Sequence, residues 1–276
     1  MQVDRKLIII NRCILKIEIG RKIKMNMKWL LSNLRKAIED YDMIQEGDRI
    51  AIGVSGGKDS LTLLRGLREL QRFYPKKFEI EAITVDMGFE GVDLTGIQQL
   101  CDKLEIRYTI PKTDIAQIIF DERKEKNPCS LCAKMRKGVL NSIAVELGCN
   151  KVALGHHKDD LVETLFLSLF YEGRIHTFAP VTYLDRKNLF SIRPLLYLSE
   201  KDIITFSEKE SLPVVQNPCI ANGFTKREYV KNLILKLNQE NPGLSDRLFK
   251  AIDTSYIPGF KKTRHLSTNV TTLKSN

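Results

Sequence analysis

The order of apolar and polar positions along the chain predicts helices that alternate with short buried strands. From Trp29 to Tyr41 the apolar residues recur every three or four positions, which is the spacing of an amphipathic helix. The run Arg49–Val54 is short and almost wholly apolar, as in a strand buried on both faces, and it leads directly into Ser55–Ser60. Helical spacing resumes from Leu61. This strand–loop–helix unit indicates an α/β protein.

Three further apolar runs repeat this arrangement, at Phe78–Val85, Ile106–Ile110 and Lys151–Gly155. Short strands that alternate with helices form parallel sheets covered by helices on both faces. Such sheets bind ligands at the carboxyl ends of their strands. Unusual polar residues follow three of the predicted strands, at Ser55–Ser60, Asp86-Met87-Gly88 and Gly155–Asp160. We therefore predict an α/β fold, a parallel sheet flanked by helices, with a site at one edge of the sheet.

The chain divides into four parts by composition. Residues 1–27 are basic and Ile-rich without periodicity, which predicts an N-terminal extension or a start codon upstream of the natural one at Met27. Residues 28–215 hold the strand–helix pattern and are assigned to one α/β domain. Residues 216–260 predict a helical C-terminal extension that contains Pro218-Cys219. Residues 261–276 carry bases and many Ser/Thr residues without acids, which predicts a disordered tail.

The composition excludes several classes of protein. With 276 residues, 43% of them hydrophobic and 28% charged, the chain is neither collagen-like nor largely disordered. No apolar run reaches the roughly 18 residues of a membrane span, and no secretory signal is present. We therefore expect a cytoplasmic protein whose six cysteines stay reduced. The net charge of +10 fits either a basic solvated surface or a polyanionic partner such as RNA, DNA or anionic lipid.

The segment Ser55–Ser60, with the sequence SGGKDS, has the residues of a phosphate-binding loop. Two glycines between a strand and a helix let backbone N–H groups approach phosphate oxygens, and the Ser and Lys side chains add donors. The Walker pattern would require Gly in place of Ile52 and Ser or Thr in place of Asp59, so transfer of a γ-phosphoryl group is not indicated. A plain glycine-rich turn is the alternative.

Cys129 and Cys132 form a C-x-x-C pair at the start of a predicted helix, and two thiolates at this spacing can bind one metal ion or cluster. Cys219 also follows a proline and is a further candidate ligand. Spacing alone leaves open a zinc site completed by His156 or His157, and also two incidental thiols. The remaining cysteines are Cys101 and Cys149, expected to be buried in apolar helices, and Cys13 in the extension.

The stretch Val54–Ser60 resembles the PP-loop of the ATP pyrophosphatases, the adenine nucleotide alpha-hydrolase superfamily. The resemblance implies a Rossmann-like sheet and cleavage of ATP between its α and β phosphates, which leaves AMP on an activated oxygen of the substrate. It also implies that Lys58 neutralises the departing diphosphate and that Asp59 helps to hold Mg²⁺. The cofactor-binding residues that it implies are Ser55, Gly56, Gly57, Lys58, Asp59, Ser60, Asp86 and Gly155.

Three other segments resemble the tRNA 2-thiocytidine synthetases of that superfamily, at Asn127–Gly138, Leu154–Asp160 and Ile192–Leu195. The likeness runs from about Trp29 to Phe260.

This resemblance implies a [4Fe–4S] cluster bound by three cysteines, which map onto Cys129, Cys132 and Cys219. One iron then stays open for hydrosulfide, much as a catalytic zinc keeps one position for its substrate. The family often has another cysteine where this chain has Asn222. The related 2-thiouridine enzymes carry extra zinc-binding cysteines that this chain lacks, which favours the thiocytidine branch.

Asp159 and Asp160 complete the polar turn after the fourth predicted strand, and with Asp59 they are the predicted catalytic residues. Asp160 and Glu163 have the spacing of a capping box. One of the two adjacent aspartates is therefore expected to have a structural role, and the other to face Mg²⁺ or the substrate. The two histidines before them are candidates for proton transfer, although a structural histidine is the commoner case.

Six basic residues and one acid lie around the C-x-x-C pair, between Arg123 and Lys137. A solvated helix face would account for them, but a basic stripe beside a reaction centre also suits a phosphate backbone. The predicted RNA-binding residues are Lys124, Lys126, Lys134, Arg136, Lys137 and Arg193, with Lys226-Arg227 as an extension.

Taken with the resemblance, these features predict a tRNA sulfurtransferase that adenylates C2 of a cytidine, cytidine-32, and replaces its oxygen by sulfur. The implied cofactors are ATP, Mg²⁺ and a [4Fe–4S] cluster. The implied partners are tRNA, a sulfur donor such as a cysteine desulfurase, and a second copy in a homodimer. The alternatives are a pyrophosphatase that modifies tRNA with nitrogen, as lysidine synthetases do, a 2-thiouridine-forming relative, and a zinc-stabilised RNA-binding protein without catalysis.

Overall fold

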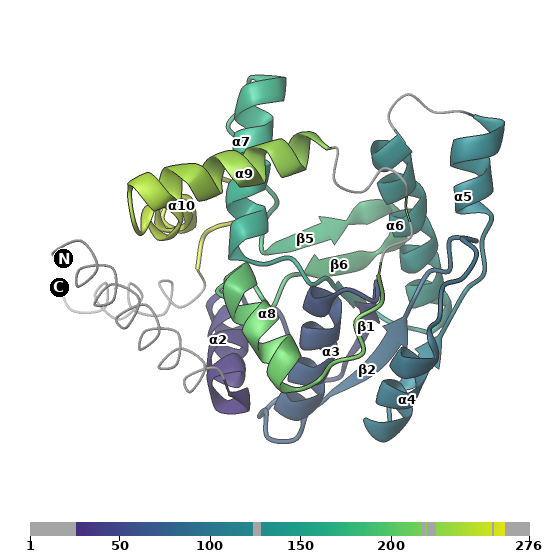
Figure 1. Ribbon diagram of the computed structural model, residues 1–276. Coiled ribbons are helices and arrows are strands. Elements are labelled where there is room, and N and C mark those ends of the chain that lie inside the picture. Colours follow the sequence, from purple (N-terminus) through teal and green to yellow (C-terminus); the bar gives the residue numbers. More distant parts are fainter. Residues whose placement is uncertain (1–25, 124–127, 217–218, 220–224, 256, 263–276) are drawn as a thin grey trace, which may run out of the picture.

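A six-stranded sheet in the order β3-β2-β1-β4-β6-β5 forms the centre of the fold (Figure 1). This computed structural model describes residues 26–123, 128–216, 219, 225–255 and 257–262. All neighbouring strands pair in parallel except β5, which runs antiparallel to β6 at one edge. The strands are β1 (Asp48–Gly53), β2 (Phe78–Ile83), β3 (Arg107–Thr109), β4 (Lys151–Ala153), β5 (Val181–Leu184) and β6 (Leu189–Ile192).

Helices cover both faces of the sheet, as predicted (Figure 1). In β1, Ile50 and Ile52 pack into a large apolar cluster with α2, α3 and α8, whereas Ala51 between them packs against α6 on the other face. This alternation explains why Ile50, Ala51 and Ile52 are all apolar although they face opposite sides of the sheet. The helices are α2 (Met27–Asp40), α3 (Lys58–Gln71), α4 (Thr95–Lys103), α5 (Ile115–Gln117), the π-helix η1 (Ile118–Glu122), α6 (Pro128–Glu146), α7 (Lys158–Glu172), the 3-10 helix η2 (Asp185–Lys187), α8 (Glu200–Lys209), α9 (Lys226–Glu240) and α10 (Leu244–Asp253).

The strand order reverses at β1, and this reversal positions the site. The chain moves outward from β1 to β2 and β3, then returns to place β4 on the other side of β1. In open α/β sheets a crevice forms at the carboxyl ends of the strands where the order reverses. The segments after β1 and β4 are Ser55–Ser60 and Gly155–Asp160, so the topology places two of the predicted polar segments side by side.

The C-terminal helices α9 and α10 pack against α7 and against each other (Figure 1). The helical character predicted for residues 216–260 is thus confirmed for the described part of that segment, while the domain boundary near residue 215 stays a prediction. The predicted N-terminal extension and C-terminal tail lie almost entirely outside the described residues. Within the part of the chain that is described, no helix has both the length and the apolar character to cross a membrane.

A buried ion pair ties the starts of the two central strands together. Lys151 Nζ lies 2.7 Å from Asp48 Oδ2, with side-chain exposures of 7% and 4%. The same Nζ donates a hydrogen bond to the Met43 carbonyl at 2.8 Å. The carboxylate also accepts from the Gln45 backbone N–H and from the Asn150 side chain. Each charge is therefore partnered on several sides, as a buried pair requires.

We predict that Lys151→Met destabilises the protein by about 3–5 kcal/mol, because it leaves the buried Asp48 carboxylate without its counter-charge. The free energy of unfolding, measured with urea, checks this value. The matched control is Arg35→Met, which removes an exposed guanidinium that pairs with Glu39 four residues along α2; there the loss should stay within about 1 kcal/mol. Equal small losses in both variants would contradict the prediction.

Candidate functional site

The loop between β1 and α3 has the geometry of an anion-binding turn. Gly56 has φ +84°, a left-handed conformation that favours glycine, and a Cβ there would lie 3.2 Å from the Cβ of Val215. The Ser60 hydroxyl accepts a hydrogen bond from the Ser55 N–H and donates to the Gly57 carbonyl. No side chain of the described residues caps the start of α3, whose first N–H groups therefore remain available to an anion.

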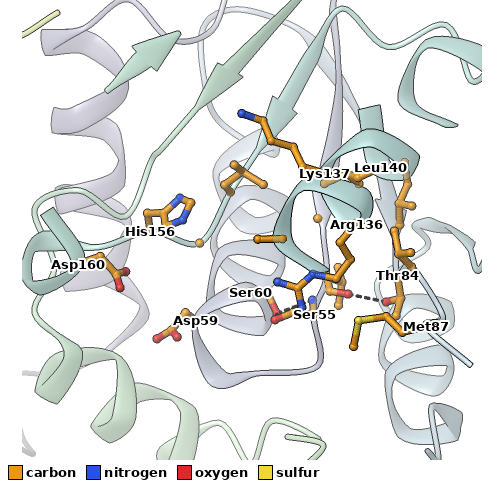
Figure 2. Close-up of a pocket in the computed structure, with 17 residues that line it drawn as sticks. Ser55, Asp59, Ser60, Thr84, Met87, Arg136, Lys137, Leu140, His156 and Asp160 are labelled. Atoms are coloured by element: carbon orange, nitrogen blue, oxygen red, sulfur yellow. Dashed lines mark hydrogen bonds between the residues drawn. The ribbon is translucent and has the colours of Figure 1, made fainter. Parts of the chain in front are cut away.

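A cavity of about 440 Å³ opens beside this loop (Figure 2). Four segments meet around it: the loop, the ends of β2 and β4, and one face of α6. The α6 residues are spaced three or four apart and so lie on the same side of the helix. The main lining side chains are Ser55, Asp59 and Ser60 of the loop, Thr84, Val85 and Met87 after β2, Leu154, His156 and Asp160 after β4, and Ala133, Arg136, Lys137 and Leu140 of α6.

Gly155 lets the end of β4 approach the first turn of α3. A Cβ at this position would lie 3.0 Å from the Asp59 carbonyl carbon and 3.0 Å from the Ser60 nitrogen. Both atoms belong to the backbone of the loop, so no side chain could move aside to relieve the contact. The structure thus places Gly155 beside the phosphate loop and on the wall of the cavity. Asp86, by contrast, is not among the lining residues; its carboxylate accepts the Gly88 N–H in the turn after β2.

Asp59 presents a carboxylate oxygen with unused acceptor capacity. Its Oδ1 is buried and accepts no hydrogen bond from the described residues. Burial raises the pKa of Asp59, against the lowering influence of His157 and Lys58. Lys58 lies 3.4 Å from this carboxylate and 3.1 Å from Glu200 Oε1 at the start of α8. A cation that entered here would find an acceptor already desolvated.

Asp159 and Asp160 both have backbone partners. Asp160 Oδ2 accepts the His157 N–H at 3.0 Å, which makes the capping box of α7 from His157 and Asp160. The predicted box of Asp160 with Glu163 is therefore wrong, because α7 begins at Lys158 and not after Asp160. Asp159 Oδ2 accepts the Glu200 N–H at 2.6 Å and so caps α8. Only Asp160 of the two lines the cavity.

The two histidines of this turn occupy different environments. His157 is buried, and its Nε2 lies 3.8 Å from Asp59 Oδ1 and 3.4 Å from Asp160 Oδ2. His156 lines the cavity, with its ring centroid 4.9 Å from that of Phe178. Burial lowers the pKa of His156 to about 4, so its imidazole is neutral near pH 7. Its Nδ1 is buried without a hydrogen-bond partner among the described residues.

The structure places the three candidate cluster cysteines near one another. Burial raises the pKa of the Cys132 thiol, and the thiols of Cys219 and Cys129 raise it further. Cys219 is therefore near enough to Cys132 to influence its thiol electrostatically, despite their separation in sequence. Cys132 Sγ also lies 3.7 Å from Met87 Sδ, and Met87 lines the cavity. The Cys132 thiol therefore lies next to the wall of the cavity that the phosphate loop borders.

No three His, Cys, Asp or Glu side chains of the described residues are grouped closely enough to hold a single metal ion. The described residues therefore do not form the alternative zinc site of these thiols and a histidine. Cys101 and Cys149 are buried, as predicted, and Cys13 lies outside the described residues.

The predicted RNA-binding residues separate into three groups. Lys134, Arg136 and Lys137 are exposed on α6, and the last two line the cavity. Lys124 and Lys126 lie outside the described residues.

The prediction that Arg193 binds RNA is wrong, because this residue is only 6% exposed. Its Nη1 donates to the Ala179 carbonyl at 2.6 Å, and its guanidinium lies 4.9 Å from the Phe178 ring centroid. Burial lowers the pKa of Arg193 to about 10. The side chain supports the edge of the sheet and does not reach the surface.

A second, charged cavity of about 220 Å³ adjoins the first and was not predicted. Glu200 Oε1 lies 3.1 Å from Lys58 Nζ and 2.9 Å from Lys231 Nζ, and so joins the phosphate loop to α9. Arg227 Nη1 lies 3.4 Å from Asp160 and 3.1 Å from Glu163. These partners are separated by dozens of residues in sequence, and no local pattern indicates them.

Comparison with known proteins agrees with this geometry. The PP-loop domain profile matches residues 26–238. The chain is 40% identical over 220 residues to the tRNA-cytidine(32) 2-sulfurtransferase of Geobacter sulfurreducens, covering 79% of this chain and 86% of that protein. The chain belongs to the PP-loop family, in its tRNA-cytidine(32) 2-sulfurtransferase branch. The resemblance inferred from the sequence motifs is thereby confirmed.

Two further relatives extend the comparison. The tRNA-cytidine(32) 2-sulfurtransferase of Pectobacterium carotovorum is 37% identical over 241 residues, which cover 85% of this chain and 78% of that protein. Among solved structures, the U34-tRNA thiolase NcsA from Methanococcus maripaludis with its [4Fe-4S] cluster superposes with a TM-score of 0.67 at 26% identity. That match covers 82% of this chain and 78% of the thiolase.

We predict that Gly155→Ala weakens ATP binding and lowers stability by about 1–3 kcal/mol, because the added methyl group pushes the phosphate loop away from β4. Isothermal titration with ATP and urea denaturation measure the two effects. Gly138→Ala is the matched control, since a Cβ there meets nothing within 4 Å; it should bind ATP normally and gain about 0.5–1 kcal/mol, as expected for alanine in a helix. Normal ATP affinity in Gly155→Ala would contradict the proposed contact.

We also predict that Glu163→Gln changes how stability depends on pH. Burial raises the pKa of Glu163 to about 7, and Asp160 raises it further while Arg227 lowers it. Because this folded pKa lies above the model-peptide value of 4.5, the carboxyl stabilises the fold fully below pH 4.5 and loses that contribution as the pH rises through about 7. The variant has no such titration.

Urea denaturation at several pH values checks this second prediction. The stability of the wild type relative to Glu163→Gln should fall between pH 4.5 and 7 and level off above that range. The difference cancels the opposite contribution of His156, which is common to both proteins. A difference that stays constant with pH would show that Glu163 is not held in the environment described.

Proposed function

We propose that this protein is an ATP-dependent tRNA sulfurtransferase that replaces the C2 oxygen of a cytidine, cytidine-32, by sulfur. The observation that carries the proposal is that the phosphate loop and the helix of Cys129 and Cys132 border the same cavity. The curated relatives are named for this reaction, and the similar solved structure is a tRNA thiolase with a [4Fe-4S] cluster.

The first step uses ATP bound at the loop. Backbone N–H groups of Gly56 to Ser60 bind phosphate oxygens, with the start of α3 adding its partial positive charge. The C2 oxygen of the base attacks the α-phosphorus, the α–β bond breaks, and diphosphate leaves. Lys58, which faces Glu200 in the structure, turns toward the departing charge. The product of this step carries AMP on the C2 oxygen.

Mg²⁺ fits the carboxylate of Asp59. The buried Oδ1 of this residue accepts no hydrogen bond from the described residues, and a carboxylate oxygen is the ligand that a hard cation prefers. Magnesium commonly takes one or two protein carboxylates and completes its octahedron with phosphate oxygens and water. A three-residue protein site is therefore not required, and Asp160 on the same cavity wall is the natural second acceptor.

A [4Fe–4S] cluster fits the thiols of Cys129, Cys132 and Cys219. Thiolates are the ligands of such clusters, and the ligated irons occupy separate corners, so the sulfurs stand further apart than they would around one ion. Cys129 is exposed and the other two are partly buried, which leaves their sulfurs accessible. When bound by three thiolates, such a cluster would keep one iron free for a ligand from outside the protein and would supply the sulfur chemistry.

The cavity wall orients the nucleoside between these two centres. The target base is extruded from its loop into the cavity, since it cannot react while stacked. Arg136 and Lys137 of α6 face the cavity and balance the phosphates of the nucleotide and of the RNA. The neutral imidazole of His156 offers a hydrogen bond to the base. Hydrosulfide then attacks C2, the C2–O bond breaks, AMP leaves with that oxygen, and one proton is released.

The proposal includes partners outside the chain. The tRNA backbone meets the exposed cations Lys134, Arg136 and Lys137, and the reaction consumes reduced sulfur delivered by a donor such as a cysteine desulfurase. A homodimer is also proposed as the working assembly.

The decisive experiment combines the anaerobically reconstituted protein with an unmodified tRNA transcript, ATP, Mg²⁺ and sulfide. We expect 2-thiocytidine by mass spectrometry of the digested RNA, with AMP and diphosphate formed in equal amounts. Formation of 2-thiouridine would move the assignment to the uridine-modifying relatives, one of which is the similar solved structure. Diphosphate release without a thiolated nucleoside would favour a nitrogen-transferring enzyme and overturn the proposal.

Replacement of Cys129, Cys132 or Cys219 by Ser should abolish both the visible absorption of the cluster and the thiolated product, because two thiolates cannot retain it. The control is Cys149→Ala, which removes a buried thiol on the α6 face of the sheet. That variant should keep its iron and its activity. A Cys219→Ser protein with full iron content would exclude this residue as a ligand.

A further inference from the structure

Aromatic side chains are exposed where the free end of α7 meets the start of α9. Phe170 is 49% exposed, Tyr171 45% and Tyr229 61%. Single exposed apolar residues are ordinary, but three aromatic rings on neighbouring helices indicate a binding surface. We call these three residues the aromatic platform. Figure 1 shows the end of α7 standing clear of the molecule where α9 crosses it.

The periodicity of α7 places the platform on the side that faces α9. Arg227 of α9 contacts Glu163 and Thr164, and residues seven further along a helix lie on the same side two turns on. Those residues are Phe170 and Tyr171. Phe170 is held by Phe166, with ring centroids 5.4 Å apart in an edge-to-face arrangement. The rings are therefore fixed in position while their outer faces remain open.

A cation joins the two helices within the platform. Lys226 Nζ lies 4.4 Å from the centroid of the Tyr171 ring. Tyr229 follows Lys226 by three residues on α9 and so lies on the same side of that helix. Arg174 comes just after the end of α7, where its charge is paired with that of Glu172, so Lys226 is the cation that the proposal uses. Rings beside positive charges are the combination that binds unpaired nucleotides, through base stacking and phosphate contacts.

The helix α7 carries both the platform and one residue of the cavity wall, Asp160. Lys226 and Arg227 are adjacent but reach in different directions, Lys226 to Tyr171 and Arg227 to Asp160 on the cavity wall. From Asp160 to Tyr171 is 11 positions, or roughly 16 Å along α7 at 1.5 Å per residue. On the opposite wall, α6 presents the exposed Lys134 and Lys137. The platform and these lysines thus flank the cavity.

We propose that Phe170, Tyr171 and Tyr229 stack the unpaired bases that neighbour the target nucleoside in its RNA loop, and that Lys226 binds an adjacent phosphate. This proposal rests on the tRNA substrate proposed above. A second copy of the chain is the competing occupant, but interfaces between protein chains are depleted in lysine, whereas lysine lies at the middle of this surface. An RNA loop supplies both unpaired bases, which can stack on the aromatic side chains, and phosphates, which can bind Lys226.

The test measures binding of an unmodified tRNA transcript by the full-length reconstituted protein. Tyr171→Ala and Tyr229→Ala should each weaken binding by about 5- to 150-fold, the range for loss of one base stack. Tyr171→Phe and Tyr229→Phe keep the ring and should bind as the wild type does. Phe73→Ala removes an exposed aromatic ring at the end of α3, outside the platform, and should also bind normally. Circular dichroism confirms that each variant is folded.

Lys226→Gln gives an independent readout. Loss of one phosphate contact should lower the slope of log affinity against log salt concentration by about 1. If both alanine variants bind tRNA as tightly as the wild type does, and the wild type thiolates tRNA, the proposed role of the platform is overturned and the proposed function is not. Conversion of a dimer to a monomer in those variants, with tRNA affinity unchanged, would overturn it in favour of the second copy. A wild type that neither binds nor thiolates tRNA would overturn the proposed function itself.

Discussion

The parallel pairing of β1 with β4 is the constraint on which the site depends. It joins strands that are about a hundred residues apart and brings the segments after them to the same edge of the sheet. The approach is close enough that a single methyl group at Gly155 would contact the backbone of the phosphate loop. At the other end of the same strands, Lys151 and Asp48 form their buried pair. The two strands are thus held at both ends, by charge at one and by backbone contact at the other.

The charged groups around the loop extend this arrangement to the C-terminal helices. Glu200 contacts both Lys58 and Lys231, and Asp159 caps the helix that carries Glu200. If Lys58 turns toward a bound phosphate, as proposed above, Glu200 still has Lys231 as its partner. The helix that follows Cys219 is therefore fixed to the nucleotide loop through side chains as well as through apolar packing. Such coupling suits two half-reactions that share one cavity.

The sequence was sufficient for the main architecture because parallel sheets follow strict rules. Once the runs at residues 49–54 and 151–155 were recognised as strands, the convergence of their polar ends followed from topology alone. Strands β5 and β6 were not predicted, since neither Val181–Leu184 nor Leu189–Ile192 has a clear alternation of apolar and polar residues. The C-x-x-C pair and the loop were recognisable because their spacing is local.

Most failures of prediction concern properties that depend on packing between distant segments, and the capping box is the exception. The capping box was misplaced by three residues because the start of α7 is set by backbone geometry at His157, and Asp160 with Glu163 has the same spacing in sequence. The burial of Arg193 is invisible in sequence, where an arginine before a proline looks solvent-exposed. The roles of Glu200 and Lys231 depend on partners in other helices.

Arg193 also has an effect that reaches beyond its hydrogen bonds. Its guanidinium is buried, and no carboxylate of the described residues pairs with it, so its field is not cancelled locally. It is one of the groups that lower the pKa of His156. A fixed positive charge behind the cavity wall therefore favours the binding of anions in the cavity. Arg193 thus contributes to the electrostatic potential inside the cavity. Because its charge is buried, salt in the solvent screens this potential only in part.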